Sequence, residues 1–175
     1  MSLIEVVVFI IVLGIGIAGV VTLFNQLTRA SVDPVVRKQT LALASSLLEE
    51  IELRPFTYCD PDDANVFSAA NAAACGTAEG GGAEPGESRP VFDNVNDYNG
   101  FSMADGNIKG PDDQVVPNLI GYSVIAAVAD AGGVAPFDTL PAQAVLLITV
   151  TATHNPTGTT VSLQGYRFRY APNSP

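Results

Sequence analysis

The sequence is poor in residues that bind nucleic acid, coordinate zinc or catalyse reactions. Its 175 residues include one histidine, two cysteines, no tryptophan and only eight basic residues against eighteen acidic ones. A chain with a net charge of −10 cannot supply a basic footprint for phosphates, so nucleic acid is not an expected partner. Two cysteines without a nearby histidine make a poor zinc site, because such a site needs four ligands.

Motifs of the common enzyme classes are also missing. There is no G-x-S-x-G sequence, no His/Cys set at metal-ligand spacing and no phosphate-binding glycine loop. The acidic pairs Asp62/Asp63 and Asp112/Asp113 are adjacent rather than facing, which does not favour glycoside hydrolysis. His154 lies beside a predicted turn and is interpreted as a surface residue. We therefore expect no enzyme, no cofactor and no bound metal.

Apolar and acidic residues are present in quantity, but in different parts of the chain. Residues 56–118 hold two basic and eleven acidic residues, a net charge of −9, whereas residues 119–175 are neutral. We divide the chain into an apolar helix over residues 1–28 and an amphipathic continuation over 29–55. An acidic loop region over 56–118 and a C-terminal antiparallel sheet over 119–175 follow.

The longest apolar run is Val6–Phe24, 19 residues without a charge. As a helix it is about 28 Å long, enough to cross the hydrocarbon core of a bilayer. A plain membrane anchor is one interpretation. A secretory signal peptide fits less well, because no basic segment precedes the run and no small-residue cleavage site ends it.

Two features do not fit a plain anchor. Glu5 lies at the edge of the run, where a carboxylate is costly unless it is paired, and the nearest positive charge is the α-amino group of Met1. The positive-inside rule places Arg29, Arg37 and Lys38 in the cytoplasm, although the cysteines and strand patterns that follow are typical of an extracytoplasmic domain. We expect that a basic leader once preceded Met1 and was removed, which would resolve this conflict.

The segment Met1-Ser2-Leu3-Ile4-Glu5, followed by an apolar helix, resembles the mature N-terminus of the type IV pilin superfamily. In that family a basic leader is cleaved, the new N-terminus is methylated, and the matching glutamate neutralises a neighbouring subunit's N-terminal amine during assembly. The resemblance implies these roles for Met1 and Glu5. Three further stretches are similar to MSHA-type pilin D proteins, namely Asp33–Gln39, Pro55–Asn65 and Gly165–Asn173.

The resemblance implies a structural pilin subunit that polymerises through its N-terminal helix into an extracellular filament. Its partners are then copies of itself, the inner membrane before assembly, and the pilus assembly machinery. Two alternatives remain open: a minor tip or priming pilin (or pseudopilin), and a membrane-anchored periplasmic binding domain that never polymerises. Adhesion, motility, DNA uptake, secretion and electron transfer are all compatible tasks, although 7% aromatic residues do not favour electron transfer.

The apolar helix lacks the proline that many bacterial pilins carry about two-thirds of the way along it. Gly14, Gly16 and Gly19 either allow local melting, since each glycine destabilises a helix by about 1 kcal/mol, or provide small surfaces for close helix packing. Pro34 predicts a kink near residues 30–34. Beyond it, helical spacing predicts an apolar stripe that covers a sheet and ends at Arg54-Pro55. The stripe consists of Thr40, Leu41, Ala44, Leu47, Leu48 and Ile51.

The acidic region is longer than a compact domain normally tolerates as loop. We expect Cys59 and Cys75 to pair in an oxidising compartment and to staple it, contributing about 3 kcal/mol. Two weak calcium candidates lie in this region, although solvated turns are the preferred interpretation. The first contains Asp60 and Asp62, and the second is an EF-hand-like start at Asp105 and Asn107 in which Lys109 occupies a ligand position.

Period-2 alternation predicts three C-terminal strands, at Ile120–Val128, Ala144–Thr153 and Thr160–Tyr170. A turn is predicted at His154–Gly158 and a bulge at Gly165, where the apolar phase of the last strand changes. Asp93–Met103 is predicted to be a short extended segment that docks on the domain. The expected fold class is therefore α+β and type IV pilin-like: a long N-terminal helix, a disulfide-stapled loop and a three- to four-stranded antiparallel sheet.

Overall fold

The computed structural model describes residues 2–175, and for residues 25–33 it describes the backbone alone. The chain forms two compact units, residues 1–38 and residues 39–175. Helix α1, Leu3–Glu52, begins in the first unit and ends in the second. Helical backbone continues through Gly14, Gly16, Gly19 and Pro34. Local melting at the glycines and the kink near Pro34 both stay predictions.

The part of α1 in the second unit buries one stripe of side chains against the sheet, consisting of Thr40, Leu43, Ala44, Leu47 and Ile51. The prediction of Leu41 in this stripe was wrong, because Leu41 is 46% exposed. Leu41 lies six residues before Leu47, which turns it about 120° around the helix away from the core. Leu43, which the prediction omitted, lies about one helical turn before Leu47 and belongs to the same buried core.

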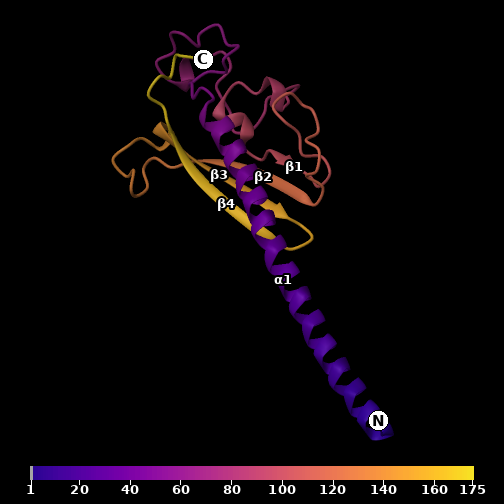
Figure 1. The fold of residues 1–175 in the computed structure, drawn as a ribbon. Helices are drawn as coiled ribbons and strands as arrows, with labels where there is room; N and C mark the ends of the chain where they lie inside the picture. Colours follow the sequence, from indigo (N-terminus) through magenta and orange to yellow (C-terminus); the bar gives the residue numbers. More distant parts are fainter. Residues whose placement is uncertain (1) are drawn as a thin grey trace. The chain divides into compact units, whose positions relative to one another are not determined.

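The second unit contains one antiparallel sheet of four strands in the order β1-β2-β3-β4 (Figure 1). The strands are β1 at Ser102–Met103, β2 at Tyr122–Asp130, β3 at Val145–His154 and β4 at Thr159–Phe168. One face of β2 is buried at Tyr122, Val124, Ala126 and Val128, as the alternation predicted. Ile120 precedes the strand and is exposed. The α+β class and the four-stranded antiparallel sheet are therefore confirmed.

The turn between β3 and β4 lies where it was predicted. β3 ends at His154 and β4 begins at Thr159, and the amide of Gly158 donates to the carbonyl of His154 at 2.9 Å. Gly158 has a φ of +69°, a conformation that a residue with a side chain rarely adopts. The hairpin is therefore set by a local sequence signal.

The predicted bulge at Gly165 was wrong. β4 pairs with β3 without interruption, and Gly165 lies opposite Ile148 in the ladder. Before Gly165, the apolar residues of β4 lie on its inner face, where Leu163 packs against the core. After Gly165, the large apolar residues Tyr166 and Phe168 lie on its outer face. There both rings contact the ring of Phe137 edge to face, with centroids 5.0 and 5.3 Å apart. The change in the sequence pattern therefore reflects an aromatic cluster on the outer face of a regular strand, and not a bulge in its backbone.

The absence of a side chain at Gly165 allows α1 to approach β4 closely. A Cβ atom placed there would lie 1.9 Å from Glu52 Oε1 and 3.2 Å from Leu48 Cδ1. Both atoms are at the ends of side chains that can move. A side chain at position 165 would therefore require the side chains of Glu52 and Leu48 to move.

The acidic region contains turns and three short 3₁₀ helices rather than one open loop: η1 at Ala72–Ala74, η2 at Arg89–Val91 and η3 at Val95–Tyr98. A fourth 3₁₀ helix, η4 at Ala142–Ala144, lies outside this region and immediately precedes β3. The segment predicted to be extended, Asp93–Met103, contains η3 and is a strand only at β1. Asn94 and Asp97 form a capping box at η3, which favours a turn over an extended chain.

Cys59 and Cys75 form the predicted disulfide, with Cα atoms 5.4 Å apart. Cys59 is fully buried, and together with Val66 and Ala69 it forms a small second core. The amide of Asp60 donates to the carbonyl of Thr77 at 3.2 Å, so the segments that follow the two cysteines are also joined by a backbone hydrogen bond. The disulfide therefore fixes the first part of the acidic region as a closed loop with its own packing.

Replacement of both cysteines by serine is expected to lower the free energy of unfolding by about 3 kcal/mol, because the denatured chain regains the entropy of a closed loop. Urea unfolding followed by circular dichroism measures the loss. The variant and reduced wild-type protein should have the same midpoint, and oxidised wild-type protein a higher one. Equal midpoints for oxidised and reduced wild type would show that the crosslink does not stabilise the fold.

Candidate functional site

The first segment of α1 exposes an unbroken apolar surface. Residues Leu3–Phe24 have a mean hydropathy of 3.0, and none of them is buried by the described part of the chain. Large side chains such as Phe9 and Ile15 are more than 60% exposed. Soluble monomers rarely expose apolar patches beyond a few hundred Å², and each Å² covered contributes about 25 cal/mol. The segment is long and apolar enough to cross a membrane, a property that signal sequences share.

Glu5 is the one charged residue in this segment, and it lies in the first turn of the helix. Its Oε2 atom accepts a hydrogen bond from the amide of Ser2 at 3.3 Å, and its own amide donates to the carbonyl of Ser2 at 3.1 Å. A carboxylate at this position is favoured by the partial positive charge of the helix N-terminus. The predicted pairing with the amine of Met1 lies outside the described residues. Glu5 thus caps its own helix while its side chain remains accessible.

The three predicted glycines of this segment meet no steric constraint within the described chain. A Cβ atom added at Gly14, Gly16 or Gly19 would have no heavy atom within 4 Å. A shallow hollow surrounds Gly16 and is lined by Val12, Leu13, Ile17, Val20 and Val21. Glycine at these positions therefore lowers helix stability without relieving a contact inside the chain.

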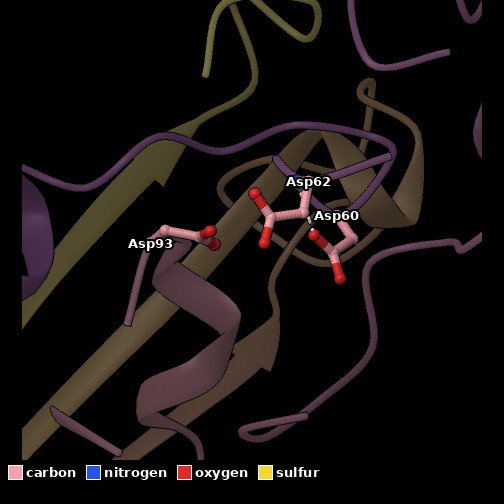
Figure 2. A group of neighbouring side chains, drawn as sticks. All are labelled: Asp60, Asp62 and Asp93. Carbon is pink, nitrogen blue, oxygen red and sulfur yellow. Dashed lines mark hydrogen bonds between the residues drawn. The ribbon is translucent and has the colours of Figure 1, made fainter. Parts of the chain in front are cut away.

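Two of the predicted calcium ligands do lie together. Asp60 and Asp62 follow the disulfide, and the amide of Asp62 donates to Asp60 Oδ1 at 2.7 Å. The structure adds Asp93, which follows η2, so that three carboxylate oxygens lie within 4.8 Å of one another (Figure 2). Sequence analysis missed Asp93, because thirty residues separate it from the other two. All three side chains are exposed or half-exposed, so water can solvate them.

The other predicted calcium residues lie elsewhere. Asp105 Oδ1 accepts a hydrogen bond from the amide of Gly121, which joins the segment after β1 to the start of β2. Asn107 donates its amide to the carbonyl of Ala104 at 3.0 Å, as in a turn. Neither residue belongs to a group of carboxylates close enough to share a cation among the described residues. Asp105 therefore acts as a backbone cap, and calcium binding at Asp105 and Asn107 stays a prediction.

His154 lies at the end of β3 and contacts its neighbours rather than an acid. Its Nδ1 atom is 2.8 Å from Thr157 Oγ1, and its ring centroid is 4.6 Å from that of Tyr122. These contacts connect the β3–β4 turn to β2. They do not place a carboxylate next to the imidazole, as catalytic base arrangements require.

Glu50 and Arg89 form an ion pair that sequence analysis did not predict. Arg89 Nε donates to Glu50 Oε1 at 2.8 Å and Nη2 donates to Oε2 at 2.5 Å, so the pair is bidentate. The Tyr98 hydroxyl also donates to Glu50 Oε1, at 2.7 Å, and Arg89 Nη1 donates to the carbonyl of Lys109. The two charged side chains are 12% and 10% exposed.

These contacts link α1, η2, η3 and the segment at Lys109. They border a cavity of about 850 Å³, which is mainly apolar and is lined in part by Leu43, Leu47, Met103 and Ile108.

Comparison of the chain with protein-family models, with curated proteins and with solved structures finds no match. The described chain has two distinctive features: an exposed apolar helix with one carboxylate at its start, and an acidic region held by a disulfide.

Proposed function

We propose that this chain is a pilin-like structural subunit that polymerises through the apolar segment of α1 into an extracellular filament. The observation that carries the proposal is the Leu3–Phe24 surface, which the described chain leaves entirely uncovered. A membrane covers such a surface before assembly, and the same segments of other copies cover it afterwards. Close packing of the apolar helices against one another stabilises the bundle after they leave the lipid, and burial in the bundle keeps about twenty apolar residues of each subunit out of water.

Glu5 supports polymerisation over simple anchoring. In a simple membrane anchor, a carboxylate in the first helical turn does no more than cap its own helix, and such a group is costly in an apolar environment. In a bundle of identical helices it becomes useful, because only certain offsets between subunits bring it next to a neighbour's N-terminal amine. The pairing then sets the axial register of the filament.

The second unit supplies the soluble surface of the subunit. It has its own hydrophobic core and its own disulfide, neither of which needs the Leu3–Phe24 segment. The acidic region of residues 56–118, with a net charge of −9, lies in this unit. Such a charge keeps a polymer dispersed in solution and away from nucleic acid.

Electron microscopy of filaments sheared from cells, combined with mass spectrometry of their subunits, tests the proposal. We expect thin filaments in which this chain is the main component and begins with a methylated residue. Gold labelling separates the alternatives, because label along the shaft indicates a main subunit and label only at the ends indicates a tip or priming subunit. Recovery of the chain solely from the inner membrane would refute polymerisation and favour an anchored binding domain.

A further inference from the structure

The sheet of the second unit has two edges of very different length. β1 forms one edge with only two residues, whereas β4 forms the other edge with ten (Figure 1). A strand at the edge of a sheet presents a row of backbone N–H and C=O groups that no neighbouring strand satisfies. The β4 edge is therefore long enough to accept a further strand.

The ladder between β3 and β4 shows which residues of β4 bond away from the sheet. The amide of Arg169 donates to the carbonyl of Ala144 at 2.9 Å, which extends this ladder by one residue beyond β4. In an antiparallel pair, residues that bond to the neighbouring strand alternate with residues that bond outward. The backbone groups of Arg169 and of every second residue before it therefore face β3. The outward set consists of Thr160, Ser162, Gln164 and Tyr166.

The four outward residues form an open edge without the usual protection. No turn or loop of the described chain bonds to their amides and carbonyls. Proteins commonly protect such an edge with a charged side chain, a proline or a bulge. Residues 159–166 contain no charged residue and no proline, and β4 pairs with β3 without interruption. The edge is thus a template for pairing with an extended chain.

We propose that the β4 edges of two copies of this chain pair with each other, antiparallel and about a two-fold axis at Leu163. This register places Thr160 opposite Tyr166 of the second copy, a combination of β-branched and aromatic residues that is favourable across strands. Ser162 then lies opposite Gln164 of the second copy. Four outward residues in each chain supply four donors and four acceptors, so the pair forms eight hydrogen bonds and leaves none of these groups unsatisfied.

The distribution of charge favours a second copy as the occupant of this edge. The chain has a net charge of −10, of which −9 lies in residues 56–118, so two copies repel each other through the acidic region. Residues 119–175, which include all of β4, are neutral. The proposed register also places no like charges opposite each other, because Arg167 faces Thr159 of the second copy. A basic partner would instead be attracted to the acidic region.

This contact is distinct from the one that would build the proposed filament. A two-fold contact uses the same surface on both copies and closes after two of them, so it cannot propagate by itself. It involves the second unit and none of the Leu3–Phe24 surface. Pairing through β4 would therefore join two free subunits or two neighbouring filaments, and the proposal holds whether or not the chain polymerises.

Disulfide crosslinking of the full-length protein in detergent tests both the contact and its register. Cα atoms of hydrogen-bonded opposite residues lie about 5.5 Å apart, which a disulfide spans, whereas diagonal neighbours lie about 7–8 Å apart. A mixture of Ser162→Cys and Gln164→Cys chains should therefore give several-fold more crosslinked dimer on non-reducing gels than either variant alone. The native cysteines do not compete, because Cys59 and Cys75 are bonded to each other.

The matched control is a mixture of Thr149→Cys and Thr151→Cys chains. These residues lie on β3 directly opposite Gln164 and Ser162, on the same face of the sheet but one strand away from the edge. Their mixture should give only the background level of dimer. Equal crosslinking in the control and the β4 mixture, or no crosslinking in the β4 mixture, would overturn the proposal.

Sedimentation of the full-length protein in detergent measures dimerisation independently of crosslinking. Ser162→Pro removes one outward donor from each chain, and thus two hydrogen bonds from the pair, but it leaves the ladder with β3 intact. It should weaken dimerisation by at least roughly tenfold. Ser162→Ala keeps the amide and should dimerise like wild type, and circular dichroism checks that both variants are folded. Equal dimerisation of a folded Ser162→Pro variant and wild type would show that the copies associate through another surface.

Discussion

Replacement of Glu5 by alanine is expected to leave the second unit folded and to prevent filament formation. In the described chain the Glu5 side chain contacts only the amide of Ser2, so its loss should not disturb the core or the disulfide. In an apolar bundle, however, the N-terminal amine of the neighbouring subunit would lose its partner. An unpaired buried charge costs about 3 kcal/mol, which reduces an association constant by roughly 100-fold.

Filament yield in sheared fractions, measured by electron microscopy and immunoblotting, gives the result for this variant. Glu5→Gln keeps the shape of the side chain and removes its charge, so it should fail in the same way. Thr22→Val is a suitable control, because the Thr22 hydroxyl donates to the carbonyl of Ala18 in the same helix at 2.8 Å. Normal filaments from Glu5→Gln would show that charge pairing does not set the register.

Replacement of Glu50 by glutamine is expected to lower the free energy of unfolding by about 3 kcal/mol at neutral pH. The change leaves the Arg89 guanidinium without its carboxylate in a site where both side chains are nearly buried. It also weakens the hydrogen bond that the Tyr98 hydroxyl donates to the side chain of residue 50. Glu49, the adjacent residue, is exposed, so Glu49→Gln makes the same change of charge and should have little effect.

The difference between wild type and Glu50→Gln should depend on pH in a defined direction. Burial by itself would raise the pKa of Glu50, but the hydrogen bonds from Arg89 and Tyr98 outweigh it and hold that pKa below its ordinary value of 4.5. A lowered carboxyl pKa contributes stability that is present above the unfolded-state pKa and is lost as pH falls through the folded-state value. The difference in the free energy of unfolding between wild type and Glu50→Gln should therefore be largest at pH 7 and should decrease progressively below pH 4.5.

Urea unfolding of both proteins at pH 7 and at several pH values below 4.5 measures this difference. The comparison between the two proteins is needed, because the raised pKa of Glu79 changes total stability with pH in the opposite sense. The double variant Glu50→Gln/Arg89→Met should be more stable than the sum of the single changes predicts. A pH-independent difference would show that the ion pair does not carry the effect.

Local sequence patterns were sufficient to predict the structure of segments that are determined by interactions between neighbouring residues. The apolar run Val6–Phe24, the alternation along β2 and the turn before Gly158 each follow from the periodicity or the backbone preference of neighbouring residues. The disulfide also followed from composition, because only two cysteines exist to pair. In each case a few adjacent side chains determine the outcome.

Prediction from the sequence failed where contacts between distant segments determine the local structure. The period-2 pattern of β4 suggested a bulge at Gly165, yet the strand stays regular and its two outer rings, Tyr166 and Phe168, contact the distant ring of Phe137. Asp105 lies in a predicted turn, and the sequence pattern did not show that it accepts a hydrogen bond from the amide of Gly121. A residue pattern alone does not show which partner a side chain will find sixteen or more positions away.

The sequence by itself determined that this protein has an apolar helix with one carboxylate at its start, a stapled acidic region and an antiparallel sheet. Those features depend on which residues are present and on their spacing along the chain. Only the tertiary structure decided which acids lie together. Glu79 and Asp97 are far apart in the sequence and meet because the disulfide loop and the η3 turn pack side by side, so their burial and missing partners are properties of the fold.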